Sequence, residues 1–138
     1  MTDLDALVDR YNTLIDRLRT EAQRAMQRID RSKSTISELR RLCESGSAPA
    51  LLTFLAYSDD VTSYVEQSNA LAAKTKTHVA FFESLIMRNT AVRRRHAERL
   101  ATTLGVLESV ITDYRAANTR LEARTTASLE QIRAAASD

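Results

Sequence analysis

Proline and glycine are nearly absent from this sequence, which contains one proline, Pro49, and two glycines, Gly46 and Gly105. From residue 50 to the end there is no proline, and Gly105 is the only glycine. Gly is favoured just after a helix C-terminus and Pro in the first turn of a helix, so Gly46 and Pro49 predict a chain reversal at 45–49. We therefore expect an all-α protein, an elongated helical hairpin or antiparallel coiled-coil bundle.

Cysteine, aromatic residues and long apolar runs are also scarce. The single Cys43 cannot form a disulfide within the chain and fits a reducing compartment. Aromatics make up 5% and Trp is absent, so any core is mostly aliphatic. The longest apolar run, at 50–57, is far shorter than the roughly 20 residues that span a bilayer. The N-terminus lacks the apolar segment of a signal peptide. We expect an intracellular protein, cytoplasmic or nuclear, without a transmembrane segment.

Residues arranged for catalysis or metal binding are missing as well. Two glycines cannot build a glycine-rich phosphate loop. His78 and His96 have no Cys, Asp or Glu beside them at metal-ligand spacing. Asp59 and Asp60 are interpreted as a helix cap, and Cys43 lies at a helix C-terminus, where the dipole opposes a thiolate. We therefore predict no enzyme, no cofactor, and no catalytic, cofactor-binding or metal-binding residue.

A heptad pattern occupies the first third of the chain. Hydrophobic residues form 43% and charged residues 28% of the sequence, which is too apolar for a disordered chain. Steps of three and four, with one four-residue stutter near Leu18, predict a helix at about 3–44 with a coiled-coil seam. The seam positions are Leu4, Leu7, Tyr11, Leu14, Leu18, Ala22, Ala25, Ile29, Ser32, Ile36, Leu39 and Cys43.

Residues 50–136 are predicted to be helical, with two apolar stripes. The first is broad, includes Val61, Val79 and Ile86, and indicates a helix buried against two neighbours. The second begins at Leu100 and is weakened by polar residues, which can select register or partner at a cost in stability. These polar positions are Asn118, Thr125 and Ser128.

Two architectures fit this pattern. Residues 50–136 form either one long helix or two helices separated by a turn near 89–91, which would give a three-helix bundle. A further break at 58–60 is a second alternative. Division of the chain into three stretches of similar length favours three helices. The lack of Gly or Pro near residue 89 favours a continuous helix, because a tight turn between helices without Gly is less usual. We therefore expect a hairpin of two long helices, with the three-helix bundle as the alternative. Two thin helices bury little apolar surface, so self-association or a helical partner is expected.

The sequence has more apolar side chains than packing along one narrow seam can bury, and some of them are candidates for partner binding. Residues 50–57, ALLTFLAY, have one polar member and cannot present a polar face in a helix. They cover the end of the chain's own bundle or form a docking surface. The candidate partner-binding residues are Leu51, Leu52, Phe54, Leu55, Phe81, Leu107, Ile111, Tyr114 and Leu121.

The formal net charge is +2, and a basic stretch lies at 88–99. Its arginines are candidates for binding an anionic partner, and a solvated surface is the simpler interpretation. No aromatic residue is interleaved with them, which disfavours recognition of single strands by stacking. The candidates are Arg88, Arg93, Arg94, Arg95 and Arg99.

These features favour a non-enzymatic interaction protein: a small coiled-coil subunit that assembles with itself or other helical chains, as a homo- or hetero-oligomer, to scaffold a larger complex. The alternative is a binding module whose stretch 88–99 contacts DNA, RNA or an acidic filament surface. A third hypothesis is a tether or escort at a secretion or membrane-traffic machine.

Overall fold

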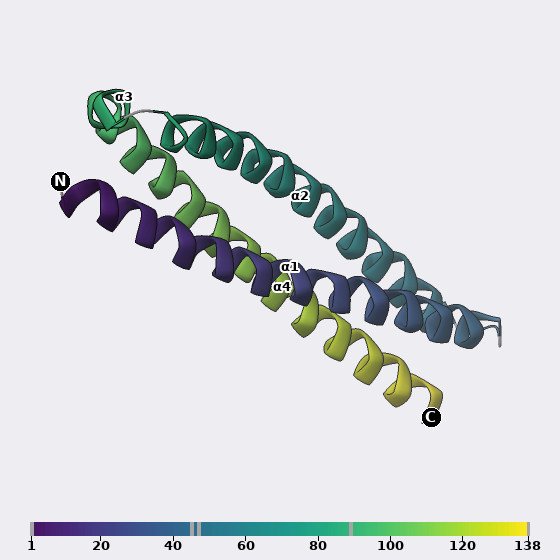
Figure 1. The fold of residues 1–138 in the computed structure, drawn as a ribbon. Helices are drawn as coiled ribbons and strands as arrows, with labels where there is room; N and C mark the ends of the chain where they lie inside the picture. The colour runs from purple at the N-terminus through teal and green to yellow at the C-terminus, as the bar shows by residue number, and fades with distance from the viewer. Residues whose placement is uncertain (1, 45, 47, 89, 138) are drawn as a thin grey trace. The chain divides into compact units, whose positions relative to one another are not determined.

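In a computed structural model that describes residues 2–44, 46, 48–88 and 90–137, the chain is helical nearly throughout. Three long helices pack against one another: α1 (Thr2–Cys43), α2 (Ala48–Ile86) and α4 (Ala97–Ser137) (Figure 1). A short helix, α3 (Thr90–Arg95), precedes α4. The residues described contain no β-strand. The prediction of an all-α helical bundle is confirmed.

The reversal between α1 and α2 follows the sequence signals. The amide of Gly46 donates a hydrogen bond to the carbonyl of Cys43, the last residue of α1, over 3.0 Å. Gly46 has a φ of 87°, a left-handed conformation that a side chain disfavours. Pro49 lies in the first turn of α2, where its missing amide hydrogen costs no hydrogen bond. The sequence also predicts Ser47 as the N-cap of the helix after the reversal, and Ser47 lies outside the described residues.

The second half of the chain corrects two expectations. Helix α2 continues through Asp59 and Asp60, so a break at 58–60 and a cap formed by these residues are wrong. A continuous helix over 50–136 is also wrong, because α2 ends at Ile86 and helical structure resumes at Thr90. The alternative with a break near 89–91 and three long helices is the one observed. Asn89 itself lies outside the described residues.

Burial of the α4 stripe explains why the chain reverses without glycine or proline. Leu100, Leu104 and Leu107 have no exposed surface once α4 packs against the other helices. Full burial of each leucine contributes roughly 1.5–3 kcal/mol, whereas each hydrogen bond lost at a helix break costs about 1 kcal/mol. The stretch 88–99 offers little apolar surface to a continuous helix, so packing of the following residues determines the fold.

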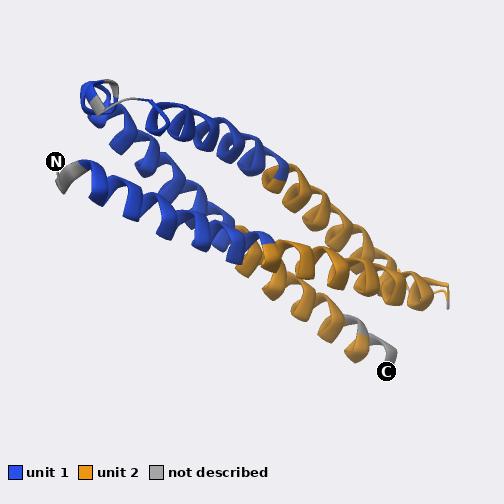
Figure 2. Cartoon of the chain, viewed as in Figure 1, with its two compact units in different colours: residues 1–22, 69–115 blue, residues 23–68, 116–138 orange. Residues whose placement is uncertain are grey.

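Two compact units divide the chain (Figure 2). Unit 1 comprises residues 1–22 and 69–115, and unit 2 comprises residues 23–68 and 116–138. Each unit contains a segment of α1, α2 and α4, and unit 1 also contains α3. The prediction of one domain over 1–138 stays a prediction.

The core of unit 1 is aliphatic with one aromatic pair. The rings of Tyr11 and Phe82 stack with their centroids 4.1 Å apart. An ion pair of 2.6 Å joins Arg10 of α1 to Glu108 of α4. The buried core residues are Tyr11, Leu14, Leu18, Leu71, Phe82, Leu85, Leu100, Leu104, Leu107, Val110 and Ile111. Unit 1 is therefore held mainly by apolar burial.

The core of unit 2 is more polar. The buried Tyr57 hydroxyl of α2 is hydrogen-bonded to Ser32 Oγ of α1, at 3.2 Å, and to Thr125 Oγ1 of α4, at 2.7 Å. The Tyr64 hydroxyl donates a hydrogen bond to Asn118 Oδ1. These bonds connect all three helical segments of unit 2.

Candidate functional site

Three exposed leucines at the start of α2 form the first candidate surface, which we call the leucine patch. Leu51, Leu52 and Leu55 are 48%, 69% and 50% exposed. They lie within two turns of one helix in unit 2, and Phe54 beside them is half-buried. Single exposed leucines are common on protein surfaces, but three at this spacing form a contiguous apolar area.

Three other predicted partner-binding residues lie inside the molecule. Leu107 and Ile111 belong to the core of unit 1, and Leu121 is buried in unit 2, all with exposures of 4% or less. The seam of α4 is covered by the chain's own helices, so these residues are withdrawn from the candidate surface. Phe81 and Tyr114 are half-buried against the core of unit 1.

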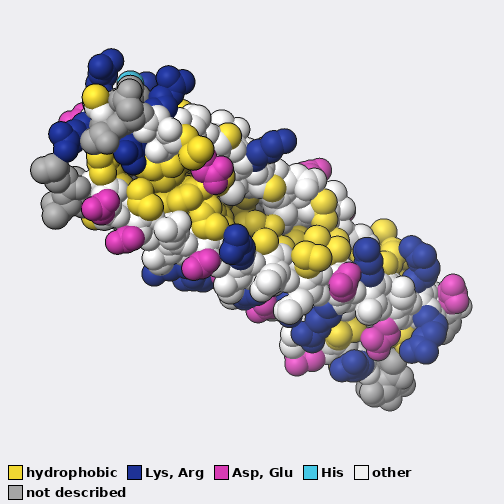
Figure 3. Space-filling model, viewed as in Figure 1, with side chains coloured by type: hydrophobic (Ala, Val, Ile, Leu, Met, Phe, Trp, Pro, Cys, Tyr) yellow, Lys and Arg dark blue, Asp and Glu magenta, His cyan; other side chains and the backbone are white. Residues whose placement is uncertain are grey.

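An apolar groove on unit 1 is a second candidate surface, and the sequence pattern did not reveal it. It has a volume of about 360 Å³ and is lined by segments of three helices. Ile15 and Ala22 line it from α1, Ala72 and Val79 from α2, and Tyr114 from α4. Figure 3 shows hydrophobic side chains along the strip between the α1 and α2 segments of this unit.

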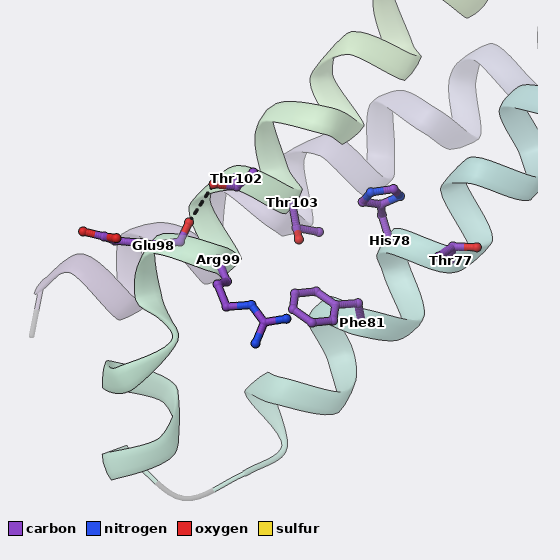
Figure 4. Close-up of a pocket in the computed structure, with 7 residues that line it drawn as sticks. All are labelled: Thr77, His78, Phe81, Glu98, Arg99, Thr102 and Thr103. Carbon is purple, nitrogen blue, oxygen red and sulfur yellow. Dashed lines mark hydrogen bonds between the residues drawn. The ribbon is translucent and has the colours of Figure 1, made fainter.

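A pocket of about 470 Å³ lies between α2 and α4 in unit 1 (Figure 4). The Arg99 guanidinium carbon lies 5.1 Å from the centroid of the Phe81 ring, within the range of a cation–π contact. His78 Nδ1 lies 2.8 Å from the carbonyl oxygen of Lys74. Glu98 also lines the pocket, and the negative charge of its carboxylate disfavours an anionic ligand there. The backbone carbonyl of Glu98 accepts a hydrogen bond from the Thr102 hydroxyl.

The predicted basic stretch is distributed over a helix break. Arg88 follows α2, Arg93 to Arg95 belong to α3, and Arg99 belongs to α4. Figure 3 shows Lys and Arg side chains around α3. Within the described part of the chain, Arg88, Arg95 and Arg99 form no ion pair with a carboxylate. These three side chains are exposed, whereas Arg93 is partly buried.

One titratable group in unit 1 is strongly perturbed. The Tyr11 hydroxyl donates a hydrogen bond of 2.9 Å to Glu83 Oε1. Burial of the phenol, followed by its hydrogen bond to Glu83 and the charge of that carboxylate, raises the pKa of Tyr11 above its usual range. This arrangement favours the neutral form of the Tyr11 phenol. The hydrogen bond between Tyr11 and Glu83 also joins α1 to α2.

Other reactive side chains are isolated from one another. The described residues contain no cluster of three His, Cys, Asp or Glu side chains that could hold a metal ion. Cys43 is a half-buried free thiol at the end of α1. Asp60 lies 4.0 Å from Arg124, so it belongs to a surface ion pair. Across the described helices, none is long and apolar enough to cross a membrane.

No family model, curated protein or solved structure matches this chain.

Proposed function

We propose that this protein is a non-enzymatic interaction protein, a small helical subunit that assembles with itself or with other helical chains to scaffold a larger complex. The leucine patch is the observation that supports this most directly. An exposed apolar area of this kind is typical of a surface that another protein covers. The three leucines lie on one helix, and Leu55 follows Leu52 by three positions and Leu51 by four. This is the spacing of the apolar side chains that a helix packs against a partner protein.

The experiment replaces all three leucines of the patch by Gln. Wild-type protein and the triple variant are compared by sedimentation velocity over a range of concentrations and by pull-down from an extract of the source cells. We expect the variant to lose either self-association or specific partners while it retains its helical circular dichroism.

A matched control replaces Met87, which is 84% exposed in unit 1, by Gln. This changes an exposed apolar side chain outside the patch and should leave assembly unaltered. If the wild type is a monomer at every concentration and the triple variant retains the same partners, the proposal is wrong.

The second candidate function is binding of an anionic partner such as DNA, RNA or an acidic filament through residues 88–99. It is favoured by the exposed Arg88, Arg95 and Arg99, which carry no compensating carboxylate among the described residues. The test variant replaces the exposed Arg88 and Arg95 by Glu. Arg93 is left unchanged because it is partly buried, and reversing its charge would also perturb packing. The control makes the same charge change at the exposed Lys33 and Arg41.

Duplex DNA and single-stranded RNA are the probes, measured by fluorescence anisotropy at about 50 and 200 mM salt. Phosphate contacts predict weaker binding at higher salt and a greater loss of affinity in the Arg88/Arg95 variant than in the control. Equal affinities of the two variants would exclude this function for nucleic acids.

A further inference from the structure

The apolar groove of unit 1 has the form of a site for one more helix. Ile15 and Ala22 line one side, Ala72 and Val79 the other, and Tyr114 of α4 also contacts the space. A helix with its side chains is about 10 Å wide, and an apolar ridge at steps of three and four fits between two neighbouring helices. A helix bound here would complete a four-helix arrangement around this unit.

Charges beside the groove indicate the chemistry of that helix. Arg19 lines the groove from α1 and Lys76 lines it from α2, and none of the described residues that line it is acidic. Residues 67–82 of α2 contain Lys74 and Lys76 but no Asp or Glu. Arg19 lies 3.8 Å from Asp16, but both side chains are more than 70% exposed, so this pair is weak and easily exchanged.

We propose that this groove binds an amphipathic helix whose apolar ridge is flanked by Asp or Glu. Acidic flanks would face Arg19 and Lys76 while apolar side chains contact Ile15, Ala72 and Val79. A second copy that presented the same groove would instead bring like charges together, which is unfavourable. This inference rests on the proposed function, since it names the partner class of an interaction protein.

The test selects binders from a display library of 18-residue peptides. Leucines are fixed along one helical face, and the flanking positions vary among Glu, Gln and Lys. With the full-length wild-type chain as bait, we expect Glu to be enriched at the flanks. With the charge-reversed variant Arg19→Glu/Lys76→Glu as bait, the preference should change to Lys. An exposed ion pair predicts a change in affinity of about twofold to fivefold for each reversed residue.

A blocking variant locates the site. Ala72 is exposed, so Ala72→Trp fills the groove without displacing a core residue and should abolish peptide binding. The matched control Ala123→Trp places the same side chain at an exposed alanine of α4 in unit 2 and should bind normally.

Three outcomes of the peptide experiments would overturn the inference: no peptide is recovered, the flanks show the same composition with both baits, or Ala72→Trp binds as well as the control. A dimer that Ala72→Trp dissociates would identify a second copy as the occupant and would also overturn it. The leucine patch is in unit 2, so loss of partners in its Gln variant would support the proposed function even if the groove binds no acidic helix.

Discussion

The hydroxyl of Tyr57 provides a direct test of how unit 2 is held together. Its exposed fraction is 0%, and those of its two hydrogen-bonded neighbours, Ser32 and Thr125, are 2% and 3%. Tyr57→Phe keeps the ring and removes only the oxygen. Both hydrogen bonds are lost, at 3.2 Å to Ser32 Oγ and 2.7 Å to Thr125 Oγ1.

The expected loss of stability follows from which partner is left without a hydrogen bond. Thr125 retains a bond of 2.8 Å from its hydroxyl to the carbonyl of Leu121. Ser32 Oγ has no other hydrogen bond among the described residues. A buried polar group left unpaired costs about 1–3 kcal/mol, so we expect Tyr57→Phe to lower the free energy of unfolding by about 1.5 kcal/mol. Adding Ser32→Ala removes the unpaired hydroxyl and should restore part of this stability.

The assay is urea unfolding followed by circular dichroism at 222 nm, at one fixed protein concentration because association would stabilise the folded state. With an m-value of about 2 kcal/mol/M, a loss of about 1.5 kcal/mol lowers the midpoint by about 0.7 M. The double variant with Ser32→Ala should have a midpoint above that of Tyr57→Phe alone. A Tyr57→Phe midpoint equal to wild type, or a double variant less stable than either single one, would refute the reasoning.

Three further predictions follow from burial and charge. Leu104→Ala, at a position with no exposure, should lower the free energy of unfolding by about 2–5 kcal/mol in urea unfolding. Leu52→Ala, at a side chain 69% exposed, should change it by less than about 0.5 kcal/mol. In an alkaline titration followed by absorbance at 295 nm, Tyr11→Phe should lose a phenol ionisation that the wild type shows above the usual pKa range of tyrosine. Because burial and Glu83 raise that pKa in the folded state, stability should be retained below about pH 10 and fall as pH rises above it, as thermal unfolding at several pH values would show. Glu122→Gln keeps a hydrogen-bond acceptor but removes the negative charge that lies 2.9 and 3.5 Å from two arginines of α1, so it should cost about 1 kcal/mol or less. Thermal unfolding should show that this cost is smaller in high salt.

The first helix and the reversal after it were predictable from sequence because their signals are local. Seam steps of three and four marked α1, and Gly46 followed by Pro49 marked the reversal. The Gly46 and Pro49 signals depend on backbone conformations that few residue types favour. The seam depends on which side chains share one face of a helix, so neither signal requires the positions of the other helices.

The break after Ile86 was not predictable from local signals. No Gly or Pro lies near residue 89, and the residues there are compatible with a helix. The break follows from burial of Leu100, Leu104 and Leu107, an energy that depends on where α4 packs. Local propensity is a weak prior that tertiary contacts override.

Of the two apolar candidate surfaces, the leucine patch was indicated by the sequence, whereas only Tyr114 of the groove was among the predicted partner-binding residues. Residues 50–57 are apolar at nearly every position, so one neighbouring helix cannot bury all of their side chains. In the structure, Leu51, Leu52 and Leu55 remain exposed. The groove joins Ile15 to Val79 and Tyr114, which are far apart in the chain. Their proximity depends on the register of three helices, which periodicity within each helix does not determine.

The sequence suggests two roles for the polar residues of the α4 stripe, selection of register or of partner, and the contacts of two of them support selection of register. Asn118 and Thr125 are hydrogen-bonded to Tyr64 and Tyr57 of α2 in the same chain. Sliding α4 by one turn along α2 within unit 2 would separate both pairs and leave buried hydroxyl and amide groups unpaired, so these residues fix the internal register. Under the proposed function, the choice of partner would depend on groups that internal packing leaves accessible. In unit 2 these include the leucine patch, and in unit 1 they include the groove with Arg19 and Lys76 beside it.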